Sequence, residues 1–284
     1  MTLAIVTAST NVERARPCLE SWVRCATTPP PIFIVLNGCA NVSKVEVAGV
    51  QAAWIHRDAY LGTVPAFRRG IDLALASGDF GILAALHDDF EIKEPGWDEK
   101  VLRYFARNPA MGLAGFGGAT GLGDLDLYEK PYDPMSLARV GFRSDLEDAE
   151  AHGMRSLLAE KVAVLDGFSQ CGRREFWEGY PAPSTPHDQR FEHSPYARPW
   201  TVLEGLGIHH HAYDAGLGAL AARYGWECWY LPLRCRHYGG QTAVGDVGYQ
   251  AWAKTQDVNG DQGFWQRAHA AIYEAFRDQL PLRT

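Results

Sequence analysis

The chain has 284 residues, of which 46% are hydrophobic and 21% charged. Those shares are ordinary for a globular protein and exclude a disordered, collagen-like or coiled-coil chain. A net charge of −7 argues against tight nucleic-acid binding, which usually needs a basic surplus.

Cysteine usage and hydropathy limit the class of protein further. The six cysteines, at positions 18, 25, 39, 171, 228 and 235, include no CxxC pair, so reduced thiols are expected rather than disulfides or a zinc ribbon. No apolar run approaches the ~18 residues of a membrane span, and the first residues lack a signal-peptide pattern. We therefore expect a cytoplasmic protein with no membrane span.

The first 116 residues alternate short apolar runs with amphipathic stretches. Strands are predicted at residues 3–7, 32–36, 54–55, 81–86 and 111–116, because these runs are short, apolar and bounded by polar or Pro-rich segments. Between them, Pro17 suits the first turn of a helix, and apolar spacings of three and four predict helices over 64–77 and 96–107. This alternation predicts an α/β fold with a mostly parallel central sheet flanked by helices.

The pattern changes after residue 117. Four glycines within 117–123 and the acidic stretch 120–160 indicate a mobile surface excursion with a helix over 146–158 inside it. A strand is expected at 162–166, a Pro-rich loop at 181–199, a helix at 214–224 and a strand at 227–231. A last helix is expected over 263–279.

Two adjacent acids, Asp88 and Asp89, directly follow the predicted strand 81–86. Carboxylates at the end of a buried strand repel each other and lose hydration, so a cation is expected beside them. Ligands of open α/β sheets bind at the carboxyl ends of strands, and hard divalent cations such as Mg²⁺ and Mn²⁺ bind carboxylates together with phosphates. A solvated turn is the alternative interpretation.

Two later features could take part in the same chemistry. Asp214 precedes an Ala- and Leu-rich helical pattern, which by itself indicates a helix N-cap. His237 follows a strand and has Arg234 and Arg236 close by, so it could be structural, or it could bind a metal while the arginines face phosphate.

Taken together and in order, these segments resemble the GT-A-fold glycosyltransferases, in particular the family-2 group of nucleotide-sugar-dependent enzymes. The resemblance covers about residues 3–240. It rests on IVTAST (5–10), IFIVLNG (32–38), YLGTVPAFRRGID (60–72), LHDDF (86–90), LDGFSQCGRR (165–174), YDAGLGALAARYG (213–225) and the RHYGG that contains His237.

The resemblance implies a GT-A (Rossmann-like) domain with acceptor-side loops and a C-terminal helix. Residues 1–116 would form the nucleotide-sugar-binding half and 117–245 the acceptor-binding, catalytic half of the same domain, with 246–284 as a C-terminal helical extension. The implied reaction moves a sugar from a nucleoside diphosphate, with UDP expected, to an acceptor hydroxyl. Inversion is expected at the anomeric carbon, although nothing in the sequence separates it from retention.

The resemblance also implies roles for individual residues. Asp89 and His237 would hold Mn²⁺ or Mg²⁺, and Asp214 would be the catalytic base, with His211 a weaker candidate. The expected donor-binding residues are Thr7, Ala8, Asn37, Gly62, Arg69, Asp88, Asp166, Gly167 and Arg236.

The sequence departs from the family pattern at three of these places. His87 takes the first position of the family's Asp-x-Asp signature, so Asp88 is expected to reach the ribose. Asn37 stands where an Asp is common, and Tyr213 replaces the first acid of the base motif.

Other functions remain open at this point. A nucleotidyltransferase would share the sheet and the acidic metal strand, and a non-catalytic nucleotide- or carbohydrate-binding module is a third hypothesis. A zinc site at histidines 209–211 is disfavoured, because neighbours in a strand face opposite ways, and the glycines of 115–121 lack the spacing of a dinucleotide fingerprint.

The acceptor stays undetermined. A saccharide, a lipid-linked sugar, a small metabolite, a protein side chain or a hydroxymethylated pyrimidine in phage DNA would all supply a hydroxyl. Trp177 is a candidate to stack on a sugar acceptor. For DNA, the available phosphate contacts are Arg68, Arg69, Arg173, Arg174 and Arg190.

Overall fold

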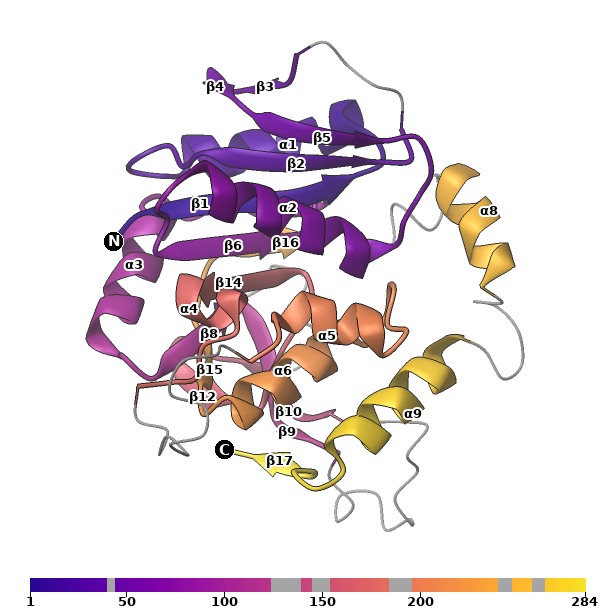
Figure 1. Ribbon diagram of the computed structural model, residues 1–284. Coiled ribbons are helices and arrows are strands. Elements are labelled where there is room, and N and C mark those ends of the chain that lie inside the picture. Colours follow the sequence, from indigo (N-terminus) through magenta and orange to yellow (C-terminus); the bar gives the residue numbers. More distant parts are fainter. Residues whose placement is uncertain (40–43, 124–138, 145–153, 184–195, 240–246, 257–263) are drawn as a thin grey trace.

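An eight-stranded sheet runs through the molecule and carries helices on both faces (Figure 1). The computed structural model describes residues 1–39, 44–123, 139–144, 154–183, 196–239, 247–256 and 264–284. The strand order of this sheet is β12-β15-β8-β14-β6-β1-β2-β5. The strands are β1 (Leu3–Ser9), β2 (Ile32–Asn37), β5 (Ala53–Arg57), β6 (Ile82–Leu86), β8 (Met111–Gly115), β12 (Glu160–Val162), β14 (Ser169–Arg173) and β15 (Glu227–Tyr230).

The sheet is mostly parallel. β1 pairs in parallel with both β2 and β6, β2 with β5, and β8 with β15, whereas β14 and β12 run antiparallel to their neighbours. The predicted fold class, an α/β protein with a mainly parallel central sheet flanked by helices, is confirmed. Strands from both sides of residue 117 enter this one sheet.

Helices cover the two faces of the sheet in two groups. One face carries α1 (Val12–Arg24) and α3 (Trp97–Arg107), and the other carries α2 (Thr63–Ser77), α4 (Arg174–Glu178), α5 (Pro199–Gly205) and α6 (Tyr213–Arg223). Along β1, Ala4 and Val6 pack on the α2 side while Leu3 and Ile5 pack on the α1 side. The period of two in a strand therefore divides its apolar residues between two cores.

The C-terminal part adds two helices and a short strand. α8 (Val247–Thr255) and α9 (Phe264–Phe276) follow the sheet, and Ile272 of α9 is buried in the same core as α6. β17 (Leu282–Arg283) then pairs with β9 (Gly117–Leu122) of a second sheet. None of the described helices is both long enough and apolar enough to cross a membrane.

The Gly-rich segment is a buried strand rather than the expected surface excursion. β9 (Gly117–Leu122) belongs to a five-stranded sheet with β10 (Arg139–Ser144), β11 (Met154–Arg155), β13 (Val164–Leu165) and β17. A Cβ on Gly118 would lie 2.7 Å from the Val164 carbonyl oxygen, and one on Gly117 would lie 2.9 Å from the Phe168 ring. The glycines therefore permit close packing between strands. The helix expected over 146–158 lies largely outside the described residues, and β11 occupies part of its end.

The first helix begins earlier than the sequence predicts. Asn11 is its N-cap and accepts a hydrogen bond from the Arg14 N–H, so Pro17 lies inside α1 rather than in its first turn. A capping side chain at the N-terminus outweighs the local preference of a single proline. This start places the N-terminus of α1 directly after β1.

Two pairs of short strands complete the described elements. β3 (Glu46–Val47) pairs with β4 (Val50–Gln51), and β7 (Phe90–Ile92) pairs antiparallel with β16 (Cys235–His237). The second pair lies immediately after the two adjacent acids and determines the geometry of the candidate site.

Candidate functional site

The order of strands places a crevice at the carboxyl ends of β1 and β6. From β1 the chain adds β2 and β5 on one side, and α2 then returns it to β6 on the other side of β1. Such a reversal of strand order leaves an opening between the loops that follow the two central strands, where open α/β sheets bind ligands. The loop after β6 contains the two adjacent acids.

A tight turn holds those acids. The Phe90 N–H donates to the His87 carbonyl oxygen at 3.2 Å, so Asp88 and Asp89 occupy the two middle positions of the turn. The His87 N–H donates to the Phe168 carbonyl oxygen at 3.0 Å, and the Trp22 indole N–H donates to that of Phe90 at 2.6 Å. The backbone on both sides of the acids is therefore anchored in the core.

The pairing of β16 with β7 brings His237 to this turn. His237 lies opposite Phe90 in the register, and its Nε2 atom is 3.2 Å from the Asp89 Oδ1 atom. The His87 Nδ1 atom is 3.9 Å from the same carboxylate oxygen. Candidate ligand atoms of His87, Asp89 and His237 all lie within 4.8 Å of one another. The predicted proximity of His237 to the acids is thus observed, while a metal between them stays a prediction.

These three side chains suit a divalent cation. Atoms that bind one ion at about 2.1 Å lie roughly 3 to 4.2 Å apart, a range that includes both distances from the Asp89 oxygen. Burial raises the Asp89 pKa, but the contact with His237 and the positive charge of either imidazole outweigh it, so the pKa is lowered overall. The partly buried position of His87 lowers the pKa of its imidazole. A charged carboxylate and a neutral imidazole are the forms that bind metals.

Asp88 faces a different environment from Asp89. Burial raises its pKa from the ordinary 3.8 to about 7, although a hydrogen bond with Ser9 and the charge of Arg14 lower it. Asp88 and Asp89 both line a cavity of about 200 Å³, together with Arg14, Ala15, Pro17, Cys18 and Tyr238. A buried carboxyl group with a raised pKa beside an arginine marks this cavity as a binding position for a polar or charged ligand.

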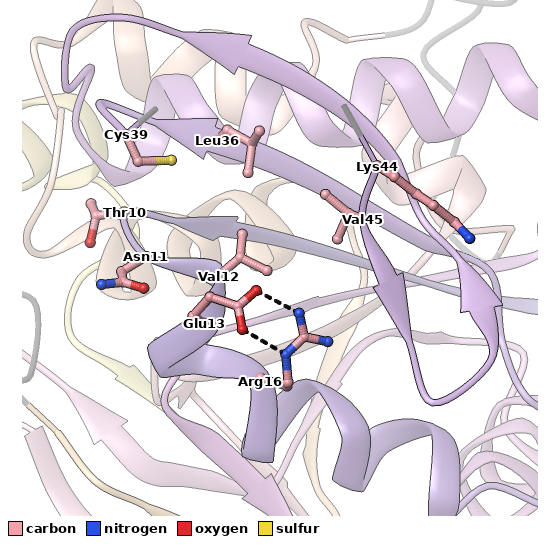
Figure 2. A pocket seen from close by; sticks show the side chains of 9 residues that line it. All are labelled: Thr10, Asn11, Val12, Glu13, Arg16, Leu36, Cys39, Lys44 and Val45. Atoms are coloured by element: carbon pink, nitrogen blue, oxygen red, sulfur yellow. Dashed lines mark hydrogen bonds and ion pairs between the residues drawn. The ribbon is translucent and has the colours of Figure 1, made fainter. Parts of the chain in front are cut away.

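A second cavity, of about 290 Å³, lies beside the start of α1 (Figure 2). Its walls are Thr10, Asn11, Val12, Glu13, Arg16, Leu36, Cys39, Lys44 and Val45. Glu13 and Arg16 form an ion pair on one wall, while Val12, Leu36 and Val45 supply apolar surface. Sequence reasoning missed these residues; the signal was their position directly after β1 and β2.

Asn37 holds a loop instead of lining either cavity. Its Oδ1 atom accepts a hydrogen bond from the Leu61 N–H at 2.8 Å, and its Nδ2 atom donates to the Gly62 carbonyl oxygen at 3.3 Å. Gly62 has φ +92°, and a Cβ there would lie 2.4 Å from the His209 carbonyl oxygen. Both residues shape the start of α2, and their contact with a nucleotide stays a prediction.

Four other predicted donor-binding residues lie outside the walls of the two cavities. Thr7 is fully buried in β1, and its hydroxyl makes no hydrogen bond within the described residues. Ala8 is half-buried near the end of β1, and Arg69 on α2 donates to the Pro65 carbonyl oxygen at 3.0 Å. Arg236 of β16 lies with its guanidinium 4.6 Å from the centre of the Tyr238 ring, beside the first cavity.

The N-terminus of α6 approaches His87 from the other side. The Tyr213 hydroxyl contacts His87 Nε2 at 2.5 Å and donates to the Gly167 carbonyl oxygen at 2.9 Å. The negative charges of Asp166 and Asp214 both act to raise the His87 pKa, although burial outweighs them. Asp214 is not the N-cap that its position predicts: Ala212, at φ 60°, fills that place, and Asp214 accepts from the Ala215 N–H within the first turn.

The three consecutive histidines lie in bends, not in a strand, and form no candidate metal group within the described part of the chain. His210 Nδ1 contacts the hydroxyls of Thr63 and Tyr60 at 2.7 and 3.0 Å. Burial holds the His210 pKa well below its usual range and lowers that of His211 to about 4. Both imidazoles are therefore neutral near pH 7.

Trp177 belongs to the core, so the predicted stacking on an acceptor is wrong. It is fully buried, its ring stacks 5.7 Å from that of Trp200, and its indole N–H donates to the Leu83 carbonyl oxygen. The position of an aromatic residue just after a strand indicates a core residue, and it does not by itself indicate contact with a ligand.

Three of the arginines suggested as DNA contacts bind groups of the protein itself. Arg173 donates to the carbonyl oxygens of Met111, Phe105 and Asn108, and Arg68 pairs with Glu204. Arg174 binds Glu178 and the Gly78 carbonyl oxygen. Arg190 lies outside the described residues. These guanidinium groups are engaged in holding the fold.

Comparison with known proteins yields structural likeness only. No sequence profile of a protein family matches the chain, and no curated protein matches it in sequence. Among solved structures it is similar to A197 from STIV, with a TM-score of 0.43 and 12% identity over 84% of this chain and 86% of the other. It is also similar to the mannosyltransferase PcManGT from Pyrobaculum calidifontis in complex with GDP-Man and Mn²⁺, with a TM-score of 0.46 and 12% identity over 96% and 70% of the two chains. Scores this low transfer no residue role to this chain.

Proposed function

We propose that the chain transfers a sugar from a nucleoside-diphosphate sugar to an acceptor hydroxyl, with Asp89 and His237 holding a divalent cation. The observation that carries this proposal is the meeting of His237 with Asp89 and His87 at the carboxyl end of β6, beside a cavity. A cation bound there would neutralise the charge of a diphosphate leaving group as the bond to the anomeric carbon breaks.

The cavity that Asp88 and Asp89 line is where the diphosphate would bind. Arg14 lies on its wall and Arg236 borders it, so both guanidinium groups can approach phosphate oxygens. Asp88 would accept hydrogen bonds from the ribose, a role that suits a carboxylate held away from the Asp89–His237 pair. Asp166, Gly167 and Arg69 are proposed to line the path of the donor sugar.

The nucleotide base would occupy the second cavity, beside the ends of β1 and β2 (Figure 2). Its apolar residues offer a surface for a flat ring, and Asn11 and Lys44 offer polar groups at the edge of that ring. Thr7, Ala8, Asn37 and Gly62 would act by shaping the loops around this position. UDP is the proposed nucleotide.

Asp214 is the proposed catalytic base. Its backbone position is set by the first turn of α6, directly after Tyr213, whose hydroxyl contacts His87, and its negative charge acts on the pKa of both His87 and His211. In an inverting reaction it would take the proton of the acceptor hydroxyl while that oxygen attacks the anomeric carbon. His211, whose pKa burial lowers to about 4, is the second candidate for this role.

The acceptor is proposed by class only: a molecule with a nucleophilic hydroxyl, such as a saccharide or a hydroxymethylated pyrimidine. The engaged positions of Arg68, Arg173 and Arg174 favour a saccharide or another small acceptor over DNA. An excess of acidic residues over the whole chain points the same way.

A thermal-shift panel tests the donor class. Nucleoside diphosphates and their sugars are added with Mn²⁺ or with EDTA, since a ligand that binds the folded state raises the melting temperature. A donor that stabilises only with Mn²⁺ is then incubated with acceptors, and the products are identified by mass. Release of a nucleoside diphosphate supports the proposal. Pyrophosphate release from a triphosphate would indicate a nucleotidyltransferase, and binding without turnover would indicate a binding module.

A further inference from the structure

We propose that His87 is a third protein ligand of the cation, that Tyr213 holds it with its proton on Nε2, and that the resulting ligand set selects Mn²⁺, Co²⁺ or Zn²⁺ over Mg²⁺. This inference rests on the cation site of the proposed function and says nothing of the sugar or the acceptor. It also assigns a positioning role to Tyr213, the residue that stands where the resembling family has an acid.

The hydrogen bonds of the Tyr213 hydroxyl decide which nitrogen of His87 carries the proton. The hydroxyl has one hydrogen, and its contact with the Gly167 carbonyl oxygen at 2.9 Å requires that hydrogen, because a carbonyl only accepts. Its contact with His87 Nε2 at 2.5 Å is therefore satisfied when Nε2–H donates to the hydroxyl. The lone pair of the neutral imidazole is then on Nδ1.

That lone pair belongs to the nitrogen on the Asp89 side of the ring. Nδ1 is the atom 3.9 Å from the Asp89 carboxylate oxygen, and the His87 and His237 ring centres are 5.6 Å apart. Phe67 limits the rotation of the imidazole, because its ring stacks against that of His87 with centres 6.2 Å apart and planes 16° apart. The imidazole is thus oriented before any ion arrives.

The position of Tyr213 depends on a glycine. A Cβ at Gly167 would lie 2.5 Å from the Tyr213 hydroxyl oxygen and 2.9 Å from the ring carbon that bears it, so any other residue would displace the hydroxyl. Tyr213 is itself buried and packs 5.6 Å from the Trp200 ring. A chain of two hydrogen bonds therefore links the loop after β13 to the cation position, from Gly167 through Tyr213 to His87. Such outer partners orient the histidines of metal sites and fix their tautomer.

The ligand chemistry sets the metal preference. Two imidazoles and one carboxylate supply two nitrogen donors and one oxygen donor, a mixed set that first-row transition metals bind with affinity rising from Mn²⁺ to Co²⁺. Mg²⁺ prefers an octahedral shell of oxygens and keeps several waters, so a site with two imidazoles serves it poorly. We expect Co²⁺ and Mn²⁺ to bind the protein at least on the order of 100-fold more tightly than Mg²⁺.

A pair of matched tyrosine variants tests the positioning role without any nucleotide sugar. Tyr213→Phe removes the hydroxyl at the start of α6. Tyr224→Phe removes a buried hydroxyl at the other end of the same helix, where it donates to the Ala197 carbonyl oxygen at 2.8 Å. Titration calorimetry with Co²⁺ should show affinity lower by about 10- to 100-fold in Tyr213→Phe and unchanged in Tyr224→Phe. Equal Co²⁺ affinity in wild type and Tyr213→Phe would overturn the positioning role of Tyr213.

Pulsed electron paramagnetic resonance of the Mn²⁺-loaded wild type counts the coordinating imidazoles directly. Two nitrogen couplings in wild type, falling to one in His87→Phe, support the proposal; one coupling in wild type, or no bound Mn²⁺, overturns it. Affinities for Mg²⁺ and Mn²⁺ within a few-fold of each other would overturn the selectivity. If Mn²⁺ binds with two imidazoles but no nucleotide sugar binds, the proposed function alone is wrong. If nucleotide sugars bind with Mn²⁺ through one imidazole, this inference alone is wrong.

Discussion

The Tyr238 N–H donates to the Asp89 carbonyl oxygen at 3.0 Å, and this bond joins the end of β16 to the turn after β6. Because His237 immediately precedes Tyr238, its imidazole lies beside the Asp89 carboxylate. Two segments far apart in the sequence thus share one small antiparallel pair, and the candidate cation site depends on that pairing.

Replacing Asp89 removes the carboxylate that faces both imidazoles. We expect Asp89→Ala to lose Mn²⁺-dependent binding of a nucleoside diphosphate by at least about 100-fold, because two imidazoles alone supply no negative charge and do not complete the shell of the ion. Calorimetry with and without Mn²⁺ measures the change. Asp79→Ala is the matched control, since Asp79 is fully exposed and precedes β6 at the opposite edge of the sheet. Equal diphosphate affinity in wild type and Asp89→Ala would contradict the assignment.

Asp214→Asn separates donor binding from transfer. The amide keeps the size of the side chain and can still accept from the Ala215 N–H, so the fold and donor affinity should be unchanged. Loss of the base should lower turnover by about 10² to 10⁴-fold. Rates come from release of the nucleoside diphosphate with the donor that the panel identifies. A variant with full turnover would remove Asp214 from the role of base.

Asp88 makes stability depend on pH. Its folded-state pKa of about 7 lies above the ordinary 3.8, so the folded protein holds a proton that the unfolded chain releases. Stability from this group is therefore greatest below about pH 4 and falls as the pH rises from about 4 to 7, by up to roughly 4 kcal/mol. Asp88→Asn should be more stable than wild type at pH 8 in EDTA and similar to it at low pH.

Urea unfolding at several pH values measures this difference, with Asp79→Asn as the exposed control. The result that would count against the buried carboxyl is a wild-type–variant difference in unfolding free energy that is the same at pH 5 and pH 8. Saturating Mn²⁺ should reduce the difference at pH 8, because a nearby cation favours the ionised carboxylate.

Arg173 is expected to matter for stability rather than for DNA. It donates to three carbonyl oxygens around the end of α3 and the start of β8, so Arg173→Met removes all of these buried side-chain hydrogen bonds. We expect a loss of about 2 to 4 kcal/mol in the free energy of unfolding. Arg103→Met, at an exposed position on α3, should change it by less than about 0.5 kcal/mol. Unchanged stability with weakened DNA binding would reverse this assignment.

Much of the central sheet was predictable because its strands are buried on both faces. A continuous apolar run such as β6 packs against the cores on both faces of the sheet. Each flanking helix has a single apolar stripe, which faces the sheet. The twin acids at the end of β6 were visible for the same reason, since polar residues directly after such a run must lie at the edge of the sheet.

What the sequence concealed depends on contacts between distant segments. β7 and β16 are three residues long, so neither has a period that marks it as a strand. The glycines of β9 indicate a loop until the strands that approach them are known, and Ala212 shows no sign of its positive φ as the N-cap of α6. The role of Tyr213 likewise depends on the Nε2 atom of His87 and the carbonyl oxygen of Gly167, which only the fold brings to its hydroxyl.

The most direct test is a titration of UDP and GDP into wild type and His237→Ala, each with saturating Mn²⁺ and with EDTA. Wild type should bind at least one diphosphate with Mn²⁺ and lose that binding in EDTA, and His237→Ala should bind weakly in both conditions. Diphosphate binding that is equally tight in EDTA, or in His237→Ala with Mn²⁺, would contradict a cation bridge at Asp89 and His237.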